Sequence, residues 1–240
     1  MHKIILTIVL IILGVVNSYS QTWFVNKTSY EKIVNKTDIV IAYNTKYNIP
    51  NYVGEALTIY MIIGDAKRLS SFTSEPTITK VSHKSYTNSG YDRGHLAPAA
   101  DFKYSQTSMS ESFSVCNIAP QNSILNQRYW NSLESYVRKL TQYCDTLYVI
   151  TGTYVANKRK ISKITTADIV IPTHFWKAIC GIKSGTYVIS AAWLYINDSD
   201  KQTYTDNVMT IDELENIIGI NLFYKLNYGK RNIENTIMLP

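Results

Sequence analysis

Residues 91–102, YDRGHLAPAADF, bring an acid, a guanidinium and an imidazole together within one short stretch. Among these groups, His95 has the side chain that can take a proton near neutral pH, because an imidazole has a pKa near 6.5. A lone histidine is nevertheless more often a structural or exposed residue than a catalytic one. Asp92, Arg93 and His95 therefore need partners elsewhere in the chain before chemistry can be assigned to them.

A second polar pair lies in residues 122–144, where apolar residues recur every three or four positions and predict a helix. Asn122 or Ser123 would cap its start. In a regular α-helix, Asn126 and Glu134 lie about 80° apart around the axis and about 12 Å apart along it, so they share a side. This geometry suits Asn126 as a direct ligand of a hard cation and Glu134 as a holder of the cation's waters, an arrangement that fits Mg²⁺ better than zinc. Considered alone, the pair is better explained as a helix decoration and a solvated carboxylate.

Two neutral amides, Asn117 and Gln121, come just before this helix in the segment CNIAPQN. Amides at such a junction can bind phosphate or orient a site. They can equally close the turn through hydrogen bonds to the backbone. Both interpretations stay open.

The remaining patterns predict short strands with few helices. A second helix is expected after the capping-box pair Thr210 and Glu213. Because strands and helices do not alternate regularly, the expected fold class is α+β. The expected strands are DIVIAY (38–43), ALTIYMII (56–63), FSVCNIAPQ (113–121), TLYVITGTYV (146–155), DIVIPTHFWKAIC (168–180) and TYVISAAWLYI (186–196), with a turn expected at YNIPN (47–51).

The first twenty residues are typical of a secretory signal peptide, with a lysine, an apolar run from Ile4 to Val16, and small residues Ser18 and Ser20 before the cut. The run is 13 residues long, and crossing a bilayer takes about 20. An uncleaved membrane anchor is the alternative. We expect residues 1–20 to be removed, a single domain over residues 21–240 because no linker or repeat interrupts them, and a secreted or periplasmic protein without stable membrane association.

Neither the net charge nor the cysteines of the chain select one class of function. The mature chain keeps 23 basic and 18 acidic residues, a net charge of +5, which is compatible with a polyanionic partner but does not require one. Cys116, Cys144 and Cys180 lack the close paired spacing of a zinc site. We expect buried thiols with at most one disulfide, whose pairing the sequence does not decide.

Together these motifs resemble the DNA/RNA non-specific endonucleases, the ββα-metal or His-Me finger group that includes endonuclease G. The family pattern is Asp-Arg-Gly-His, then Asn-x-x-Pro-Gln, then Asn-x-x-x-Trp-x-x-Leu-Glu, and it occurs here in order at residues 92–95, 117–121 and 126–134. Weaker similarity covers most of residues 45–225. The resemblance implies a ββα-metal finger embedded in a mainly antiparallel sheet flanked by helices.

The resemblance also implies roles for single residues. It makes His95 the general base that takes a proton from the attacking water, Asn126 the protein ligand of a magnesium ion, and Glu134 the residue that orders the ion's waters. Arg93 is expected to support the phosphate or the geometry of the site.

Four further residues receive roles at the substrate. Asn117 and Gln121 are expected to line the site, and Asp92 to be a structural partner at the substrate site. The family's upstream arginine, which helps to hold the phosphate, matches Arg68 best, although Glu75 stands where the family has an aspartate.

The expected activity is hydrolysis of phosphodiester bonds in DNA and RNA without sequence preference, with Mg²⁺ as cofactor and Mn²⁺ as a substitute. Water attack opposite a metal-bound 3′ oxygen leaves 5′-phosphate ends. The alternatives are a catalytically silent nucleic-acid-binding homologue and a narrower phosphodiesterase. A homodimer is expected from the resemblance alone.

Overall fold

The computed structural model describes residues 31–156, 161–164, 167–224, 226 and 236–240. The expected signal peptide, residues 1–20, lies outside these ranges, so its cleavage stays a prediction, as does the single domain over 21–240. Among the helices in the described part of the chain, none has both the length and the hydropathy needed to cross a bilayer.

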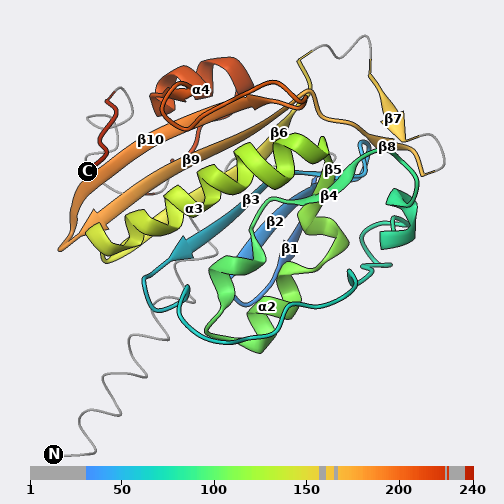
Figure 1. The fold of residues 1–240 in the computed structure, drawn as a ribbon, viewed down its shortest axis with the longest axis horizontal. Helices are drawn as coiled ribbons and strands as arrows, with labels where there is room; N and C mark the ends of the chain where they lie inside the picture. The colour runs from blue at the N-terminus through green and yellow to red at the C-terminus, as the bar shows by residue number, and fades with distance from the viewer. Residues whose placement is uncertain (1–30, 157–160, 165–166, 225, 227–235) are drawn as a thin grey trace, which may run out of the picture.

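A seven-stranded sheet with antiparallel neighbours forms the centre of the fold (Figure 1). In spatial order its strands are β1 (Glu31–Asn35), β2 (Ile39–Asn44), β3 (Ile49–Leu57), β6 (Thr146–Tyr154), β9 (His174–Lys183), β10 (Thr186–Ile196) and β11 (Val208–Met209). Two small antiparallel ribbons accompany it: β4 (Asp92–His95) with β5 (Ile118–Gln121), and β7 (Lys163–Ile164) with β8 (Ile169–Val170).

Helical elements cover both faces of the sheet. One face packs against α3 (Asn131–Leu140), and the other packs against α4 (Ile211–Ile218). The other helical segments are η1 (His83–Tyr86), η2 (Ala99–Phe102), α2 (Gln106–Ser112), η3 (Val115–Asn117), η4 (Leu125–Trp130) and η5 (Thr141–Tyr143). The fold class α+β, with a mainly antiparallel sheet flanked by helices, is confirmed.

Alternation along the strands explains why the sheet has two apolar faces. On β9, Phe175 and Ile179 belong to the core beneath α3, whereas Trp176 and Ala178 belong to the core beneath α4. Both faces are therefore buried, and the central strands are apolar along most of their length.

Several expected elements are confirmed and others are corrected. The strand at 186–196 and the start of the strand at 146–155 match β10 and β6. The expected strand 56–63 is wrong beyond Leu57, because Leu57 makes the last pair with β6 and the residues after it have no partner strand. The expected turn at 47–51 is also corrected, since β3 already begins at Ile49 and Asn48, with φ 56°, closes the turn.

Two further corrections concern single expected strands. Residues 168–180 form β8 and β9 rather than one strand, with Pro172, which has no N–H to donate, in the gap. Residues 113–121 hold the 3₁₀ turn η3 before β5. The capping box of Thr210 and Glu213 at the start of α4 is confirmed. Cys116, Cys144 and Cys180 are thiols, and Cys116 and Cys180 are buried, as expected.

The helix expected over 122–144 is capped but not regular. The Asn122 side chain accepts hydrogen bonds from the backbone N–H groups of Ile124 and Leu125, at 2.9 and 3.3 Å, so Asn122 caps it. Its next residues, Leu125–Trp130, form a π-helical segment, η4, before the α-helical turns of α3. The angle of about 80° between Asn126 and Glu134 assumed 100° per residue throughout, and the wider π turn invalidates that value.

Candidate active site

The β4–β5 ribbon and the helix that follows it form one ββα unit. The ribbon pairs Asp92 with Gln121 and His95 with Ile118. A Cβ atom at Gly94 would lie 2.2 Å from Gln121 Oε1, so only glycine lets the Gln121 side chain lie across β4. The glycine between Arg93 and His95 therefore serves the packing of the ribbon.

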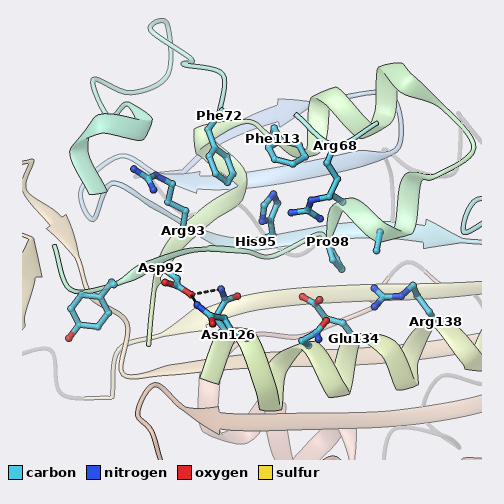
Figure 2. A pocket seen from close by; sticks show the side chains of 15 residues that line it. Arg68, Phe72, Asp92, Arg93, His95, Pro98, Phe113, Asn126, Glu134 and Arg138 are labelled. Carbon is cyan, nitrogen blue, oxygen red and sulfur yellow. Dashed lines mark hydrogen bonds between the residues drawn. The ribbon is translucent and has the colours of Figure 1, made fainter. Parts of the chain in front are cut away.

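A cavity of about 560 Å³ lies between this ribbon, the segment that carries Arg68, and the helix η4–α3. Figure 2 shows His95 and Arg68 on one side of the cavity, and Asn126 and Glu134 projecting from the helix on the other. All four side chains line the cavity, so the structure brings the expected base, the expected metal ligand and the expected water-ordering acid together.

Asp92 fixes the orientation of Asn126. Asp92 Oδ2 accepts hydrogen bonds from Asn126 Nδ2 at 2.8 Å and from Gln127 Nε2 at 2.9 Å, and Asp92 Oδ1 accepts one from Ser123 at 2.8 Å. Burial alone would raise the pKa of Asp92, but these hydrogen bonds outweigh it and lower the pKa. Because the ionised carboxylate can only accept, the Asn126 amide must turn its nitrogen to Asp92 and leave its oxygen for another partner.

His95 has an apolar and cationic environment. Its ring lies 5.0 Å from the Phe72 ring and 5.1 Å from the Phe113 ring, between centroids, and its Nε2 is buried with no hydrogen-bond partner among the described residues. Burial first, and then the positive charge of Arg68, lower the pKa of His95 to about 3. The imidazole is therefore neutral over the whole physiological pH range.

Arg68 comes from a segment whose sequence departs from the family pattern, yet it reaches the cavity. Its guanidinium carbon lies 5.2 Å from the centre of the Phe113 ring. Glu75, which replaces the family's aspartate, accepts hydrogen bonds from Lys36 Nζ at 2.6 Å and from Ser114 Oγ at 2.9 Å. These bonds hold the segment after Arg68 against the sheet edge and η3, so the glutamate still anchors it.

Glu134 is flanked by charged groups. Burial raises its pKa to about 7, while Lys177, Arg138 and Arg68 pull the pKa down. Arg138, one helical turn further along, lines the same cavity and forms an ion pair with Asp101 at 2.8 Å. The sequence reasoning missed Arg138, although its spacing of four residues from Glu134 places the two on one helix face.

Three expected site residues need correction or a different role. Arg93 lines the cavity, but Figure 2 shows its guanidinium turned away from His95, and it donates two hydrogen bonds to the His83 carbonyl oxygen, from Nε at 3.0 Å and from Nη2 at 2.8 Å. These contacts hold η1 against β4, so they favour the geometric role expected for Arg93 over contact with the substrate.

Asn117 and Gln121 are fully buried and are absent from the described lining of the cavity. The expectation that they line the site is corrected. Within the described part of the chain, the Asn117 side chain binds backbone groups: its Oδ1 accepts from the Ala97 N–H at 3.0 Å, and its Nδ2 donates to the carbonyls of Ala97 and Ser112 at 2.9 and 2.8 Å. Asn117 thus fixes the chain just after His95, while Gln121 packs on Gly94.

The donor set of the cavity fits a hard cation that keeps most of its water. Among the described residues no group of three or more His, Cys, Asp or Glu side chains could hold a metal ion. Asp92 holds the amide nitrogen of Asn126, so the amide oxygen at the cavity wall can serve as a neutral metal ligand. Glu134 lies on the same helix and lines the same cavity. One amide oxygen and one carboxylate match the sparse coordination of magnesium.

Comparison with known proteins gives consistent matches. The sequence model of the family described as DNA/RNA non-specific endonuclease matches residues 22–229. A protein named Nuclease from Syncephalastrum racemosum is 31% identical over 82% of this chain and 69% of its own length. Nuclease C1 of Cunninghamella echinulata var. echinulata is 29% identical over 88% of this chain and 90% of its own length.

A human protein and a solved structure are also similar to this chain. The human protein named Nuclease EXOG, mitochondrial, is 28% identical over 80% of this chain, which spans 56% of the human protein. A crystal structure of the EndoG/EndoGI complex, described as showing the mechanism of EndoG inhibition, superposes with a TM-score of 0.72 at 25% identity and covers 90% of this chain and 92% of the other.

Proposed function

Because this chain belongs to the DNA/RNA non-specific endonuclease family, we propose that it is a magnesium-dependent nuclease that hydrolyses phosphodiester bonds in both DNA and RNA. The observation that carries the proposal is that His95, Asn126 and Glu134 line one cavity between the ββα ribbon and its helix. Such a site can take a proton from water and offset negative charge that grows on a phosphate.

His95 is the general base in this proposal. Its imidazole is neutral at the cavity wall, so it can accept a proton without first losing one. An imidazole with so low a pKa is a weak acceptor, and an anionic phosphodiester bound beside it raises the pKa toward a useful value. The hydrophobic contacts with Phe72 and Phe113 keep the ring in place.

Asn126 and Glu134 would hold the metal ion, Asn126 directly through its amide oxygen and Glu134 through water. A bound magnesium ion offsets charge on the phosphate and the leaving oxygen. Asp92 supports this arrangement, because it accepts from Asn126 Nδ2 and so keeps the amide oxygen facing the cavity. Mn²⁺ prefers similar oxygen ligands and should substitute.

Arg68 and Arg138 supply positive charge at the cavity wall. Every nucleotide of DNA or RNA carries one negatively charged phosphodiester, which these arginines can bind. Recognition through phosphate therefore does not depend on sequence. Binding through these groups also leaves the 2′ position unread, which supports action on both DNA and RNA.

The test of this function is digestion of a circular plasmid and of RNA by the mature protein, with magnesium and with a chelator. We expect cleavage of both substrates to products with 5′-phosphate ends, manganese to replace magnesium, and the chelator to stop the reaction. Binding without cleavage would identify a silent homologue. An uncut circular plasmid beside cleaved small phosphodiesters would identify a narrower enzyme.

The role of Asp92 gives a separate prediction. Asp92→Ala removes the acceptor that orients Asn126, and we expect a loss of roughly 10- to 100-fold, seen mainly as a higher magnesium concentration at half-maximal rate. The measurement is plasmid cleavage across a magnesium titration. Asp92→Asn keeps an acceptor oxygen and should lose less; equal losses in the two variants would contradict the orienting role.

For location we propose export to the periplasm or the medium, on the strength of the N-terminal sequence alone. Mass spectrometry of the protein from the medium or periplasm should show Gln21 as the first residue. An intact Met1 in a membrane fraction would instead support an anchor. Association into a homodimer also stays a prediction, which light scattering of the mature protein would test.

A further inference from the structure

The junction between the β4–β5 ribbon and the helix η4 is held by a residue that the proposed mechanism does not use. Asn197 directly follows the last residue of β10, and its side chain is half-buried. That side chain bonds to Pro120 and Asn122, which lie 77 and 75 residues away in the sequence. The contact therefore joins the central sheet to the ββα unit.

The Asn197 amide uses both its donors and its acceptor on backbone groups. Its Oδ1 accepts from the N–H of Asn122 at 2.8 Å. Its Nδ2 donates to the carbonyl oxygen of Pro120 at 3.0 Å and to that of Pro172 at 2.9 Å. A primary amide has two N–H donors and one oxygen, so each of these groups has a partner here.

The amide lies along the open edge of β5. Among the strands that the structure describes, β5 pairs with β4 alone. Backbone groups of alternate residues in a strand point to the same side, and on an edge strand they lack a partner strand. Asn197 bonds the carbonyl of Pro120 and the N–H of Asn122, as a peptide group of a neighbouring strand would.

The residue that Asn197 holds also starts the helix that carries Asn126. The Asn122 side chain caps this helix, and the Asn122 carbonyl oxygen accepts from the backbone N–H of Asn126 at 2.8 Å. Asn197 and Asn126 thus bond the two backbone groups of the same residue. Asp92 orients the Asn126 side chain, whereas Asn197 fixes the backbone from which that side chain projects.

Asn197 is itself fixed to the central sheet. Its backbone N–H donates to the Thr173 carbonyl at 2.8 Å, and the Thr173 N–H donates to the Tyr154 carbonyl at 2.9 Å, so the ends of β10, β9 and β6 are tied together. Gln202 accepts from the Ile196 N–H at 2.6 Å and donates to the Ile196 carbonyl at 2.9 Å. These bonds close the loop after Asn197 and give its short side chain a rigid base.

We propose that Asn197 is a positioning residue of the active site, which holds the junction between the ribbon of His95 and the helix of Asn126 at one place on the central sheet. The inference rests on the proposed function, in which Asn126 binds the metal ion. Asn197 does not line the described cavity, so it acts through Asn122. Supporting contacts of this kind keep a metal ligand within the narrow range of positions that binding requires.

The test is Asn197→Ala, which removes the amide and leaves the backbone of the loop in place. In metal-free protein labelled with ¹⁵N-asparagine, NMR reports the side-chain amide of Asn126, whose signal is assigned by its loss in Asn126→Ala. We expect this signal to shift or broaden, and the Asn122 N–H to exchange with solvent roughly tenfold faster, because it loses one hydrogen bond.

Magnesium binding gives the second measurement on the same variant. Isothermal titration of Asn197→Ala should show binding about 3- to 10-fold weaker than in the parent. This loss is smaller than the roughly 10- to 100-fold typical of a residue that contacts a metal ligand directly, because Asn197 acts through one further residue.

Thr173→Val is the matched control. The Thr173 hydroxyl accepts from the Ala156 N–H at 2.9 Å and donates to the Tyr154 carbonyl at 3.0 Å, so this variant also loses hydrogen bonds to the backbone at the same end of the sheet. It should lower Tm by a similar amount. Its Asn126 signal and its magnesium binding should stay at parental values.

Asn197→Asp gives a second variant of nearly the same shape. It keeps an acceptor for the Asn122 N–H but places a carboxylate oxygen opposite the carbonyl oxygens of Pro120 and Pro172. It should also bind magnesium more weakly than the parent, and it decides the test if Asn197→Ala does not fold. Parental magnesium binding in the folded Asn197 variants, or an equal loss in Thr173→Val, overturns the proposal.

The NMR measurement separates this inference from the proposed function. If the parent protein cleaves nucleic acid but the Asn126 signal and magnesium binding are alike in parent and Asn197→Ala, the role of Asn197 fails while the function stands. If the parent does not cleave and the Asn126 signal still moves, Asn197 positions Asn126 but the nuclease assignment of this site fails.

Discussion

Replacing His95 with alanine is expected to slow plasmid cleavage by roughly 10²- to 10⁴-fold, the range typical of a lost general base. The imidazole lines the cavity opposite Asn126 and Glu134. Without it, the remaining charges can bind a phosphate but cannot take the proton of the attacking water. Initial rates of supercoiled-plasmid relaxation at saturating magnesium measure the loss.

The matched control is His83→Ala. The carbonyl oxygen of His83 accepts from Arg93, and this contact survives because the substitution leaves the backbone in place. His83→Ala should therefore cleave at close to the parental rate. Circular dichroism should show both variants folded, and a folded His95→Ala that cut as fast as the parent would refute the assignment of the base.

The pH dependence of the parent enzyme follows from the same site. The pKa of His95 is lowered to about 3, so the base form is present at every pH above that value. The pKa of Glu134 is raised to about 7, so its carboxylate is lost as pH falls through 7. We expect the acid limb of kcat/KM, which reports the free enzyme, to follow Glu134. The limb should disappear in Glu134→Gln along with most of the activity.

Replacing Asn126 with alanine is the second change with a large expected effect. It removes the oriented amide oxygen at the cavity wall and leaves Asp92 without one of its three donors. We expect a loss of at least roughly 100-fold at fixed magnesium, comparable to the removal of one electrostatic group from an active site. Isothermal titration of magnesium should show weaker binding in the variant.

Gln127→Ala is the comparison for Asn126→Ala. It removes the other amide that donates to Asp92 Oδ2, without removing the oxygen assigned to the metal. Its loss should be clearly smaller. Equal losses in the two variants, with unchanged magnesium binding in both, would mean that Asn126 acts through Asp92 rather than as a ligand.

The motifs were sufficient to predict the centre of the site because they encode its chemistry in residue type and order. His95, Asn126 and Glu134, which the resemblance placed in one site, line one cavity. The ordered pattern also led to the correct family and the correct α+β class. A long, mostly apolar strand such as β10 was found within its actual limits.

Residues that hold the motifs in place were harder to interpret. Asn117 and Gln121 stand within the pattern, yet both are buried, and the three contacts of Asn117 are to backbone groups. A polar residue needed to fix the chain beside His95 has the same sequence signal as one that binds substrate. The depth of the side chain decides between them, and depth depends on the tertiary fold.

Lys177 shows a second limit. In the sequence it interrupts an apolar strand, and such a residue usually indicates an exposed edge. Its burial follows from partners contributed by β3, β6, η2 and α3, which lie far from it along the chain. No local pattern could have predicted that assembly.

Because the segment Leu125–Trp130 is π-helical, the number of residues in it is as important for the active site as their side chains. It follows the Asn122 cap and ends at the buried Trp130, and it sets the direction in which the Asn126 side chain points away from the helix axis. Deleting one residue there would favour the regular i→i−4 ladder and swing Asn126 by about 100° away from Asp92. The exposed Arg128 can vary in side chain, but we expect that shortening or extending this spacer would separate the Asn126 amide from Asp92 and His95.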